Sequence, residues 1–188
     1  MSRYSELDEI PNYGLSDVSR YLRLPLEKTR RWNKALLGHD HDLFPISFAN
    51  LLELHVLKSL RVEHELPLQR IRKALSVLKA DFPSAHPLLD REFHKYGLDL
   101  LMKNEEVFVN LNRKKQIMLR EMVEAYADRI DNSGANLRYF PFTSDVDLAR
   151  PKLVVLDPAI SFGRPVLVGT GISTEIIAGR FRAGDSMQ

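Results

Sequence analysis

The chain has 188 residues, of which 44% are hydrophobic and 28% charged, with a formal net charge of +2. This composition allows one large domain or two small ones and excludes wholesale disorder. The absence of cysteine excludes disulfides, thiolate zinc sites and cysteine nucleophiles. No apolar run approaches the roughly 20 residues that a membrane helix needs, and the N-terminus lacks the apolar core of a signal peptide. We therefore expect a cytoplasmic protein with no membrane partner.

Two short helices are predicted near the N-terminus, after a polar stretch over 1–13 that we expect to be a flexible lead-in. Ser16 is a suitable cap for the first helix. Pro25 cannot continue that helix but can open a second one, over about 25–37. Because the turn between them is very short, the pair predicts a helix-turn-helix. The apolar face of the first helix is formed by Val18, Tyr21 and Leu22.

Positive charge is concentrated in the same stretch. Residues 20–34 contain six Lys and Arg side chains and one carboxylate, Glu27. Because the net charge of the whole chain is small, a nucleic-acid site has to come from such local clustering. Arginine side chains match the guanine edge, and most other cations of such a helix bind phosphates. The single tryptophan, Trp32, is interpreted as a buried structural residue rather than a base-stacking one.

Two further helices complete the N-terminal half. The polar tip at 39–42 and the apolar residues after it suggest a small wing. Ser47 is predicted to open a third helix, which is leucine-rich around most of its circumference and therefore largely buried. Pro67 is predicted to open a fourth, with apolar residues at helical spacing. Those residues are Leu68, Ile71, Leu75 and Leu78.

The segments YGLSDVSRYLRLPLEKTRRWNKALLG, FPISFANLLELHVLKSL and LPLQRIRKAL, in this order over 14–80, resemble the winged-helix DNA-binding domain of the MerR type. The resemblance implies a recognition helix containing the Arg-Arg-Trp triplet, followed by a wing. The usual Arg-Tyr pair before the third helix is Pro45-Ile46 here. The predicted DNA-binding residues are Lys28, Thr29, Arg30, Arg31, Lys34 and, on the wing, His39 and His41.

The middle of the chain is predicted to mix strands and helix. The segment DFPSAHP begins a linker after 81, and alternating or apolar runs then suggest short strands. A helix over 115–131, which carries Met118, Leu119 and Met122, is a candidate for subunit pairing. The predicted strands are 98–102, 107–111, 137–142 and 152–156.

The last segment reads as a turn, a strand, a glycine turn and a helix whose inner face is formed by Ile176, Ile177 and Phe181 and which stops at Gly184. It resembles the start of a small domain, originally of unknown function, that recurs in VapB-kind antitoxins encoded beside PIN-domain toxins. Gly171 stands where many members have arginine. The motif residues, expected to bind a partner or to form a structural turn, are Asp157, Gly163, Arg164, Pro165, Gly169, Thr170 and Gly171.

No catalytic group of residues emerges from the sequence, so we expect a protein that is not an enzyme and that needs no cofactor or metal. Alternating residues in the HDHD loop rarely converge on one ion. His55, near an apolar face, is interpreted as a core histidine. The scattered carboxylates Asp145, Asp147 and Asp157 lie in loop-like sequence, where turn capping is the default role.

The predicted fold class is α+β, with a MerR-like winged helix-turn-helix of four helices over 14–82. A mixed segment at 88–150, which is a candidate for dimerisation, and an incomplete antitoxin-type domain at 151–188 follow. The sequence predicts an antitoxin of a type II toxin–antitoxin system. It would repress its own operon as a homodimer on operator DNA, and neutralise a PIN-type ribonuclease toxin. The alternative is a MerR-like transcriptional regulator that senses a small effector with 88–142. A third class, an interaction module without a DNA role, also remains.

Overall fold

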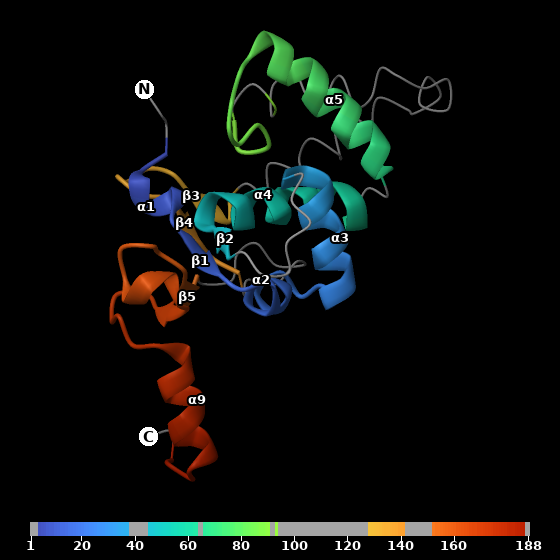
Figure 1. The fold of residues 1–188 in the computed structure, drawn as a ribbon. Helices are drawn as coiled ribbons and strands as arrows, with labels where there is room; N and C mark the ends of the chain where they lie inside the picture. The colour runs from blue at the N-terminus through green and yellow to red at the C-terminus, as the bar shows by residue number, and fades with distance from the viewer. Residues whose placement is uncertain are drawn as a thin grey trace, which may run out of the picture.

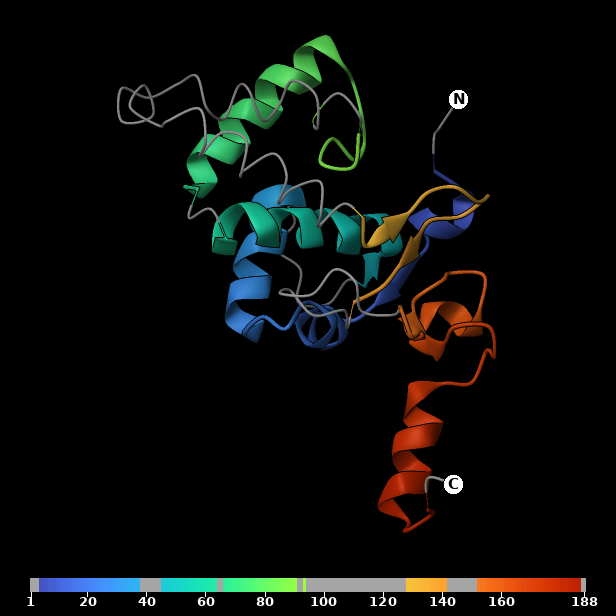
Figure 2. The same cartoon turned by 180° about the vertical axis from the view of Figure 1, so that it is seen from behind.

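The computed structural model describes residues 4–37, 45–63, 66–90, 93, 128–141 and 152–186. These residues form helices and three short antiparallel strand pairs, β1–β2, β3–β4 and β5–β6. Helix α4 lies in the middle of the molecule, with α5 on one side of it and the C-terminal helix α9 projecting at the opposite end (Figure 1; the reverse view in Figure 2). The predicted α+β class is therefore confirmed for the described part of the chain.

The first residues are ordered and packed. Helix α1 (Glu6–Glu9) is capped by Ser5, whose hydroxyl accepts a hydrogen bond from the Asp8 amide at 3.3 Å. Strand β1 (Pro11–Tyr13) pairs with β2 (Ile46–Ser47). Because Asp8 and Tyr13 are buried, the prediction of a flexible lead-in is wrong for residues 4–13. The polar appearance of this stretch concealed a cap and a strand.

Helices α2 (Leu15–Leu22) and α3 (Leu26–Leu37) confirm the predicted pair of short helices. The first helix starts two residues earlier than the Ser16 cap predicted. Gly14 is its N-cap, and the Asp17 carboxylate accepts a hydrogen bond from the Gly14 amide at 3.2 Å. This is reasonable, because a carboxylate near a helix N-terminus is favoured by the helix dipole. The predicted apolar face of Val18, Tyr21 and Leu22 is buried.

Helix α4 (Phe48–Lys58) is the centre of the core. Ser47 caps it as predicted, and the Ser47 hydroxyl accepts a hydrogen bond from the Asn50 amide at 3.2 Å. A π-helical turn (Ser59–Glu63) follows, and α5 (Leu68–Asp81) begins after Pro67. Trp32 and the apolar residues of α2 and α4 share one buried cluster with Ile71 and Leu75 of α5. The four-helix order predicted for the N-terminal half is thus present.

A small hairpin returns to this core. Strand β3 (Ile130–Asp131) pairs antiparallel with β4 (Arg138–Tyr139). The predicted helix over 115–131 therefore does not extend through its last residues, where backbone pairing with β4 overrides the helical spacing. The rest of that helix, the strands at 98–102 and 107–111, and the tip of the predicted wing lie outside the described residues.

The C-terminal segment begins with β5 (Val154–Val155), which pairs with β6 (Val166–Leu167). A 3-10 turn (Ser161–Gly163) lies between these strands, and α9 (Thr174–Arg182) follows β6. The segment joins the hairpin through reciprocal backbone hydrogen bonds between Tyr139 and Leu156, of 2.9 and 2.8 Å. The predicted order of turn, strand, glycine turn and helix is confirmed.

The prediction that Ile176, Ile177 and Phe181 form an inner face of α9 is wrong for the described structure. Their exposed fractions are 58%, 37% and 61%, and α9 contains no buried residue. Their spacing correctly indicated an apolar face but could not tell whether the same chain covers it. Gly184, at φ +94°, follows the helix end as expected of a stop residue.

Candidate nucleic-acid interface

The turn between α2 and α3 fixes the direction of α3. It comprises Arg23, Leu24 and Pro25, and Arg23 has a left-handed backbone with φ 51°. The Leu24 amide donates to the Ser19 carbonyl at 2.9 Å, and the Ser19 hydroxyl donates to the Leu24 carbonyl at 2.6 Å. These two hydrogen bonds link the last turn of α2 to the residue before Pro25 and so fix the conformation of the turn. A turn of this length is typical of helix-turn-helix pairs.

The inward face of α3 is formed by Thr29, Trp32 and Asn33. Trp32 and Asn33 lie one helical turn after Thr29, and all three residues are buried. The Thr29 hydroxyl donates to the Pro25 carbonyl at 3.2 Å. Trp32 has no exposed surface, which confirms its interpretation as a structural residue. Thr29, in contrast, was predicted to contact DNA, and its burial corrects that prediction, because a side chain with no exposed surface cannot reach a ligand.

The outward face of α3 carries positive charge. Arg30, Arg31 and Lys34 follow Glu27 at helical spacing, so these four share one side of the helix. We name the three basic residues the α3 cation stripe. Glu27 forms an ion pair with Arg30 one turn away.

Lys28 lies beside the stripe, with its ammonium 5.1 Å from the centroid of the Trp32 ring. This position suits a cation–π contact, which can orient the lysine side chain. The two wing histidines of the prediction, His39 and His41, lie outside the described residues.

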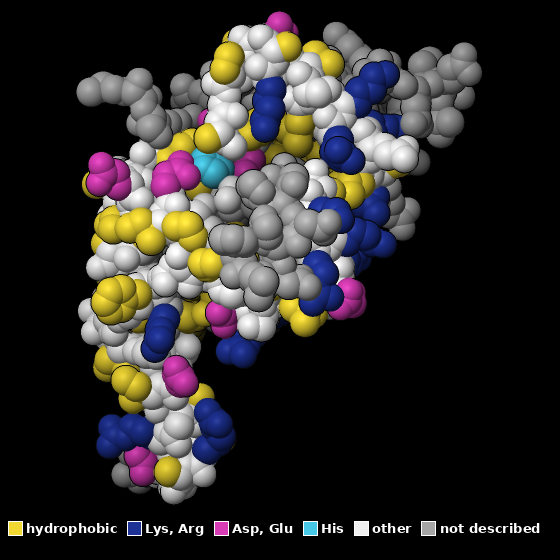
Figure 3. Space-filling model, viewed as in Figure 1, with side chains coloured by type: hydrophobic (Ala, Val, Ile, Leu, Met, Phe, Trp, Pro, Cys, Tyr) yellow, Lys and Arg dark blue, Asp and Glu magenta, His cyan; other side chains and the backbone are white. Residues whose placement is uncertain are grey.

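Further cations extend the basic surface. Arg72 and Lys73 are exposed on α5, and the space-filling view shows Lys and Arg side chains gathered on the side of the molecule where α3 and α5 lie (Figure 3). Acidic side chains are scarcer on this side than around α1. A protein of small net charge thus presents one face with the character that a phosphate backbone requires.

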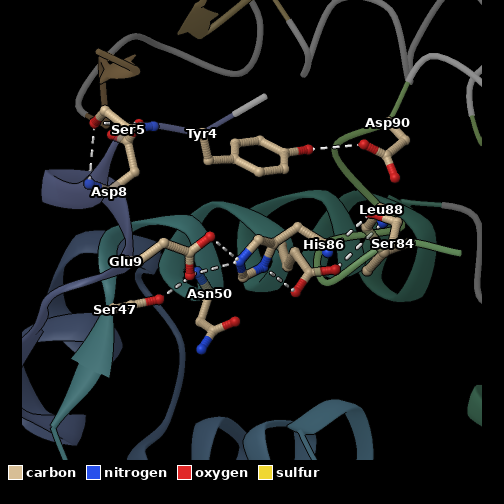
Figure 4. Close-up of polar contacts among 11 residues, drawn as sticks. Tyr4, Ser5, Asp8, Glu9, Ser47, Asn50, Ser84, His86, Leu88 and Asp90 are labelled. Carbon is tan, nitrogen blue, oxygen red and sulfur yellow. Dashed lines mark hydrogen bonds and ion pairs between the residues drawn. The ribbon is translucent and has the colours of Figure 1, made fainter. Parts of the chain in front are cut away.

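A buried polar cluster that sequence reasoning missed lies where α1, α4 and the segment after α5 meet. The His86 ring lies between two carboxylates, with Nδ1 3.1 Å from Glu53 Oε2 and Nε2 3.0 Å from Glu9 Oε1. The Glu53 carboxylate also accepts a hydrogen bond from the Leu88 amide at 3.2 Å. We name these residues the His86 cluster (Figure 4). It connects α1, α4 and the segment after α5, which are far apart in the sequence.

The electrostatics of this cluster favour a charged histidine. Burial lowers the pKa of His86, but the hydrogen bonds and negative charges of Glu53 and Glu9 outweigh it, so the net pKa is raised above its ordinary value. Burying a carboxylate such as Glu53 requires a partner of this kind. Tyr4 adds an edge-on ring contact to His86 and donates its hydroxyl to Asp90 at 2.8 Å.

Two more long-range contacts join the β3–β4 hairpin to the helices. The Tyr139 hydroxyl lies 3.0 Å from His55 Nδ1, and both residues are buried. The Leu137 amide donates to the Asp8 carboxylate at 3.3 Å. His55 is therefore a satisfied core histidine, as predicted. No periodicity could have indicated these pairs, since each joins residues more than 80 positions apart.

The residues of the predicted C-terminal motif divide into several roles. Asp157 is buried, and its carboxylate accepts the Ala159 amide at 2.9 Å, which closes the turn after β5. The Pro165 carbonyl accepts the Thr174 amide at 3.0 Å, at the start of α9. The Thr170 hydroxyl donates to Leu167 and accepts the Ile172 amide, so it stabilises the glycine turn. These residues have structural roles in the described chain.

The glycines of this motif differ in their surroundings. Gly169 and Gly171 have φ of +77° and +67° and no atom near the position of a Cβ, so they serve the turn alone. Gly163 has φ +73°, and a Cβ there would lie 1.9 Å from the Tyr13 hydroxyl oxygen. The Tyr13 hydroxyl donates to the Gly163 carbonyl at 3.0 Å. Burial raises the pKa of Tyr13, which keeps this phenol protonated as a donor.

A cleft of about 720 Å³ lies between α2 and the C-terminal segment. Arg164, the remaining motif residue, lines it together with Asp17 and Arg20 of α2 and Glu175 and Arg182 of α9. The lining therefore carries charges of both signs. Its volume falls in the range of small-molecule sites.

Within the described ranges, no group of three or more His, Cys, Asp or Glu side chains is placed to hold a metal ion. The helices described there also include none that is both long and apolar enough to cross a membrane.

Comparison with known proteins supports the resemblance seen in the C-terminal sequence. A family model described as a protein of unknown function (DUF433) matches residues 154–188. This match begins at β5 and includes the cleft-lining loop, the glycine turn and α9.

A curated protein of Mycobacterium tuberculosis, provisionally named antitoxin VapB45, is 26% identical over 216 residues, covering 96% of this chain and 86% of the relative. The crystal structure of Rv2018 from the same organism superposes with a TM-score of 0.67 at 24% identity, covering 94% of this chain and 89% of that one. The second likeness establishes a shared overall fold. The chain therefore resembles a VapB-kind antitoxin, a name that denotes a regulatory protein rather than an enzyme.

Proposed function

We propose that the chain is the antitoxin of a type II toxin–antitoxin pair, with operator DNA bound by α3 and the toxin bound by the C-terminal segment. The observation that carries the DNA part is the α3 cation stripe. Its three basic side chains face outward from a helix whose other face is buried against α4. The observation that supports the antitoxin part is the likeness to VapB45 together with the family match over 154–188.

The DNA-binding region is proposed to be a MerR-like winged helix-turn-helix over 14–82, now with β1 as an added element. In this arrangement α3 enters the major groove, where arginine side chains can read guanine edges. The remaining cations, among them Lys28 and Lys34, contact phosphates. His39 and His41 keep their proposed place on the wing. Autorepression of the operon follows from binding at the chain's own promoter.

The toxin is proposed to be a ribonuclease of the PIN class. Its binding surface would include the exposed parts of 151–188, where Arg164 and the glycine turn face solvent beside apolar residues. Val168 and Ile172, on either side of that turn, are exposed. Such apolar groups around a turn are typical of a surface that a partner covers.

The DNA part is tested by titrating a labelled duplex of the chain's own promoter at several salt concentrations. Each phosphate contact contributes a slope of about −0.9 in log affinity against log salt, so a handful of contacts predicts a steep decline. A flat salt dependence, or no preference for the promoter over an unrelated duplex, would contradict DNA recognition by α3.

The toxin part is tested by co-expression with the product of the neighbouring gene. We expect the two proteins to co-purify and the chain to relieve the growth arrest that the neighbour alone produces. A neighbour that is not a ribonuclease, with no complex formed, would refute this part without affecting the DNA part.

A second candidate function is a MerR-like regulator that senses a small effector. The cleft between α2 and α9 favours it, because a ligand there would contact the first helix of the helix-turn-helix and the C-terminal segment together. The effector site first predicted, over 88–142, lies mostly outside the described residues. A PIN-type gene beside this one favours the antitoxin, and its absence favours the sensor.

A further inference from the structure

The cleft between α2 and the C-terminal segment brings together side chains whose chemistry indicates a class of ligand. Arg20 and Tyr21 line it from α2, and Phe162 and Arg164 line it from the loop before β6. Arg182 of α9 lies on the same lining. Segments from opposite ends of the chain therefore build one concave site of about 720 Å³, which is large enough for a small organic molecule.

The Tyr21 hydroxyl marks the point where the charges of this cleft converge. Burial raises the pKa of Tyr21, and the negative charges of Asp17 and Glu175 raise it further. The positive charges of Arg20 and Arg164 act in the opposite direction. Side chains from α2, from the loop before β6 and from α9 thus lie around one phenol. Because its pKa is raised, the phenol stays protonated and can donate a hydrogen bond to a ligand.

The carboxylates of the cleft are compensated locally, whereas two of its arginines are not. The Asp17 carboxylate accepts a hydrogen bond from the Gly14 amide, and Glu175 lies in the first turn of α9, where the helix dipole favours a negative charge. Within the described ranges, the guanidinium groups of Arg20 and Arg164 form no hydrogen bond and no ion pair. Guanidinium groups match the geometry of a carboxylate or a phosphate.

An exposed aromatic ring supplies the apolar part of the lining. The Phe162 residue is 82% exposed although it lines the cleft. Ser161 and Phe162 have left-handed backbones, with φ of 49° and 55°, a conformation that costs free energy in residues other than glycine and is found most often at functional sites. The Asn12 side-chain amide donates to the Phe162 carbonyl at 2.5 Å and maintains this conformation. A ring held in this way can stack on a flat ring of a ligand.

We propose that this cleft binds a small organic anion in which a carboxylate or phosphate is joined to a flat ring. The anionic group lies between Arg20 and Arg164 and accepts the Tyr21 hydroxyl, and the ring stacks on Phe162. Asp17 and Glu175 on the same lining repel a polyanion such as DNA, so a single anionic group fits the charge balance better. The inference deepens the second candidate function by naming the class of effector, and it rests on that function only for the consequence of binding.

The test titrates the full chain with five probes in a calorimeter. Adenosine 5′-monophosphate carries a ring and a phosphate, and indole-3-acetate carries a ring and a carboxylate. Inorganic phosphate and acetate carry the anion alone, and adenosine carries the ring alone. At least one ring-bearing anion should bind more than about tenfold more tightly than its separate parts, because both halves of the site then contribute. The preferred ring-bearing probe identifies the anionic group.

Three variants test the assignment of residues. Arg20→Gln and Arg164→Gln should each weaken binding of the ring-bearing anion about tenfold, because each removes a charge-assisted hydrogen bond. Phe162→Ala should reduce its affinity to about that of the anion alone and leave phosphate or acetate binding unchanged. The matched control is Arg180→Gln, which removes an exposed arginine of α9 that pairs with Asp185 instead of lining the cleft. It should change the affinity less than about twofold.

Three outcomes would overturn the proposal: no binding of either ring-bearing anion, a ring-bearing anion that binds no more tightly than its parts, or unchanged binding by Arg20→Gln and Arg164→Gln. Both arginines are exposed, so these variants should keep the circular dichroism of the unchanged chain. A chain that binds its promoter and its toxin but none of the probes would refute the site and leave the proposed function standing. A chain that binds neither partner but takes up a ring-bearing anion through Arg20 would support the site and refute the proposed function.

Discussion

Helices α4 and α9 are similar in length, at 11 and 9 residues, but have opposite environments. Nine residues of α4 are buried, from Phe48 to Leu57, whereas α9 has none. Helix α4 is covered by α2, α3 and the hairpin that carries Tyr139, and α9 is uncovered along its Ile177–Phe181 face. The difference teaches that apolar residues at helical spacing can be covered by the rest of the chain in one place and left exposed in another.

This comparison also separates two tasks along the chain. The packed region positions the α3 cation stripe, whose direction depends on the turn after α2 and on Trp32 beneath it. The C-terminal segment is tied to that region by a few specific bonds, among them Tyr13 to Gly163. Substitutions in the two regions should therefore have separable effects on stability, assembly and DNA binding.

The largest expected effect contrasts one aromatic residue from each region. Trp32→Ala removes a fully buried side chain and should lower the free energy of unfolding by about 3–5 kcal/mol. Phe181→Ala, measured by urea denaturation at concentrations where the chain is monomeric, should change it by less than about 0.5 kcal/mol. Similar losses for both variants would mean that α9 is part of the folded core.

The next effect concerns the bond that ties the two regions together. Gly163→Ala forces a left-handed backbone on alanine and places its Cβ against the Tyr13 hydroxyl, so it should cost about 2–3 kcal/mol of stability and expose the C-terminal segment to protease. Gly179→Ala is the matched control, because no atom lies within 4 Å of the added Cβ. It should stabilise α9 by up to about 1 kcal/mol.

A smaller effect should depend on pH. The raised pKa of His86 means that its charge stabilises the fold fully below the ordinary histidine pKa of about 6.5 and that this contribution is lost as the pH rises through the folded value. His86→Gln should therefore cost about 1–3 kcal/mol at low pH and less at higher pH. The urea denaturation midpoints of the unchanged chain and of His86→Gln, determined across this pH range, measure the difference in stability. A difference that grows with pH would show that the histidine is neutral.

The smallest effect concerns the ion pair on the outward face of α3. Glu27 neutralises Arg30 in the free protein, so Glu27→Gln should tighten promoter binding about twofold to fivefold. Asp17→Asn, on α2, removes the same charge outside the stripe and should leave affinity nearly unchanged once its modest loss of helix capping is corrected for. Weaker binding by Glu27→Gln would indicate that the pair positions Arg30 for DNA.

The sequence predicted those features that depend on local spacing. Val18 and Tyr21 marked the buried face of α2, Ser47 marked the start of α4, and the glycine turn marked the entry to α9. Each prediction used a pattern contained within a few residues. The early strand β1 escaped because its partner, Ile46–Ser47, lies more than 30 residues away, and strand pairing has no signal in one segment alone.

The candidate site was predictable in its charge but not in its orientation. The basic cluster was visible in the sequence, yet only packing against α4 shows that Thr29 faces inward and Arg31 outward. The His86 cluster could not be predicted, because Glu9, Glu53 and His86 meet only in the folded chain. Likewise, the spacing of Ile177 and Phe181 gave an apolar face and left open what covers it.

The most direct test of operator recognition by α3 compares two double variants with equal loss of charge. Arg30→Ala with Arg31→Ala removes two cations from the stripe, and Lys79→Ala with Lys152→Ala removes two exposed cations elsewhere. Affinity for the chain's own promoter should fall about 100-fold or more for the first pair, at about 1–3 kcal/mol for each arginine. It should stay within about threefold for the second. Equal losses for both pairs would contradict the assignment of α3 as the recognition helix.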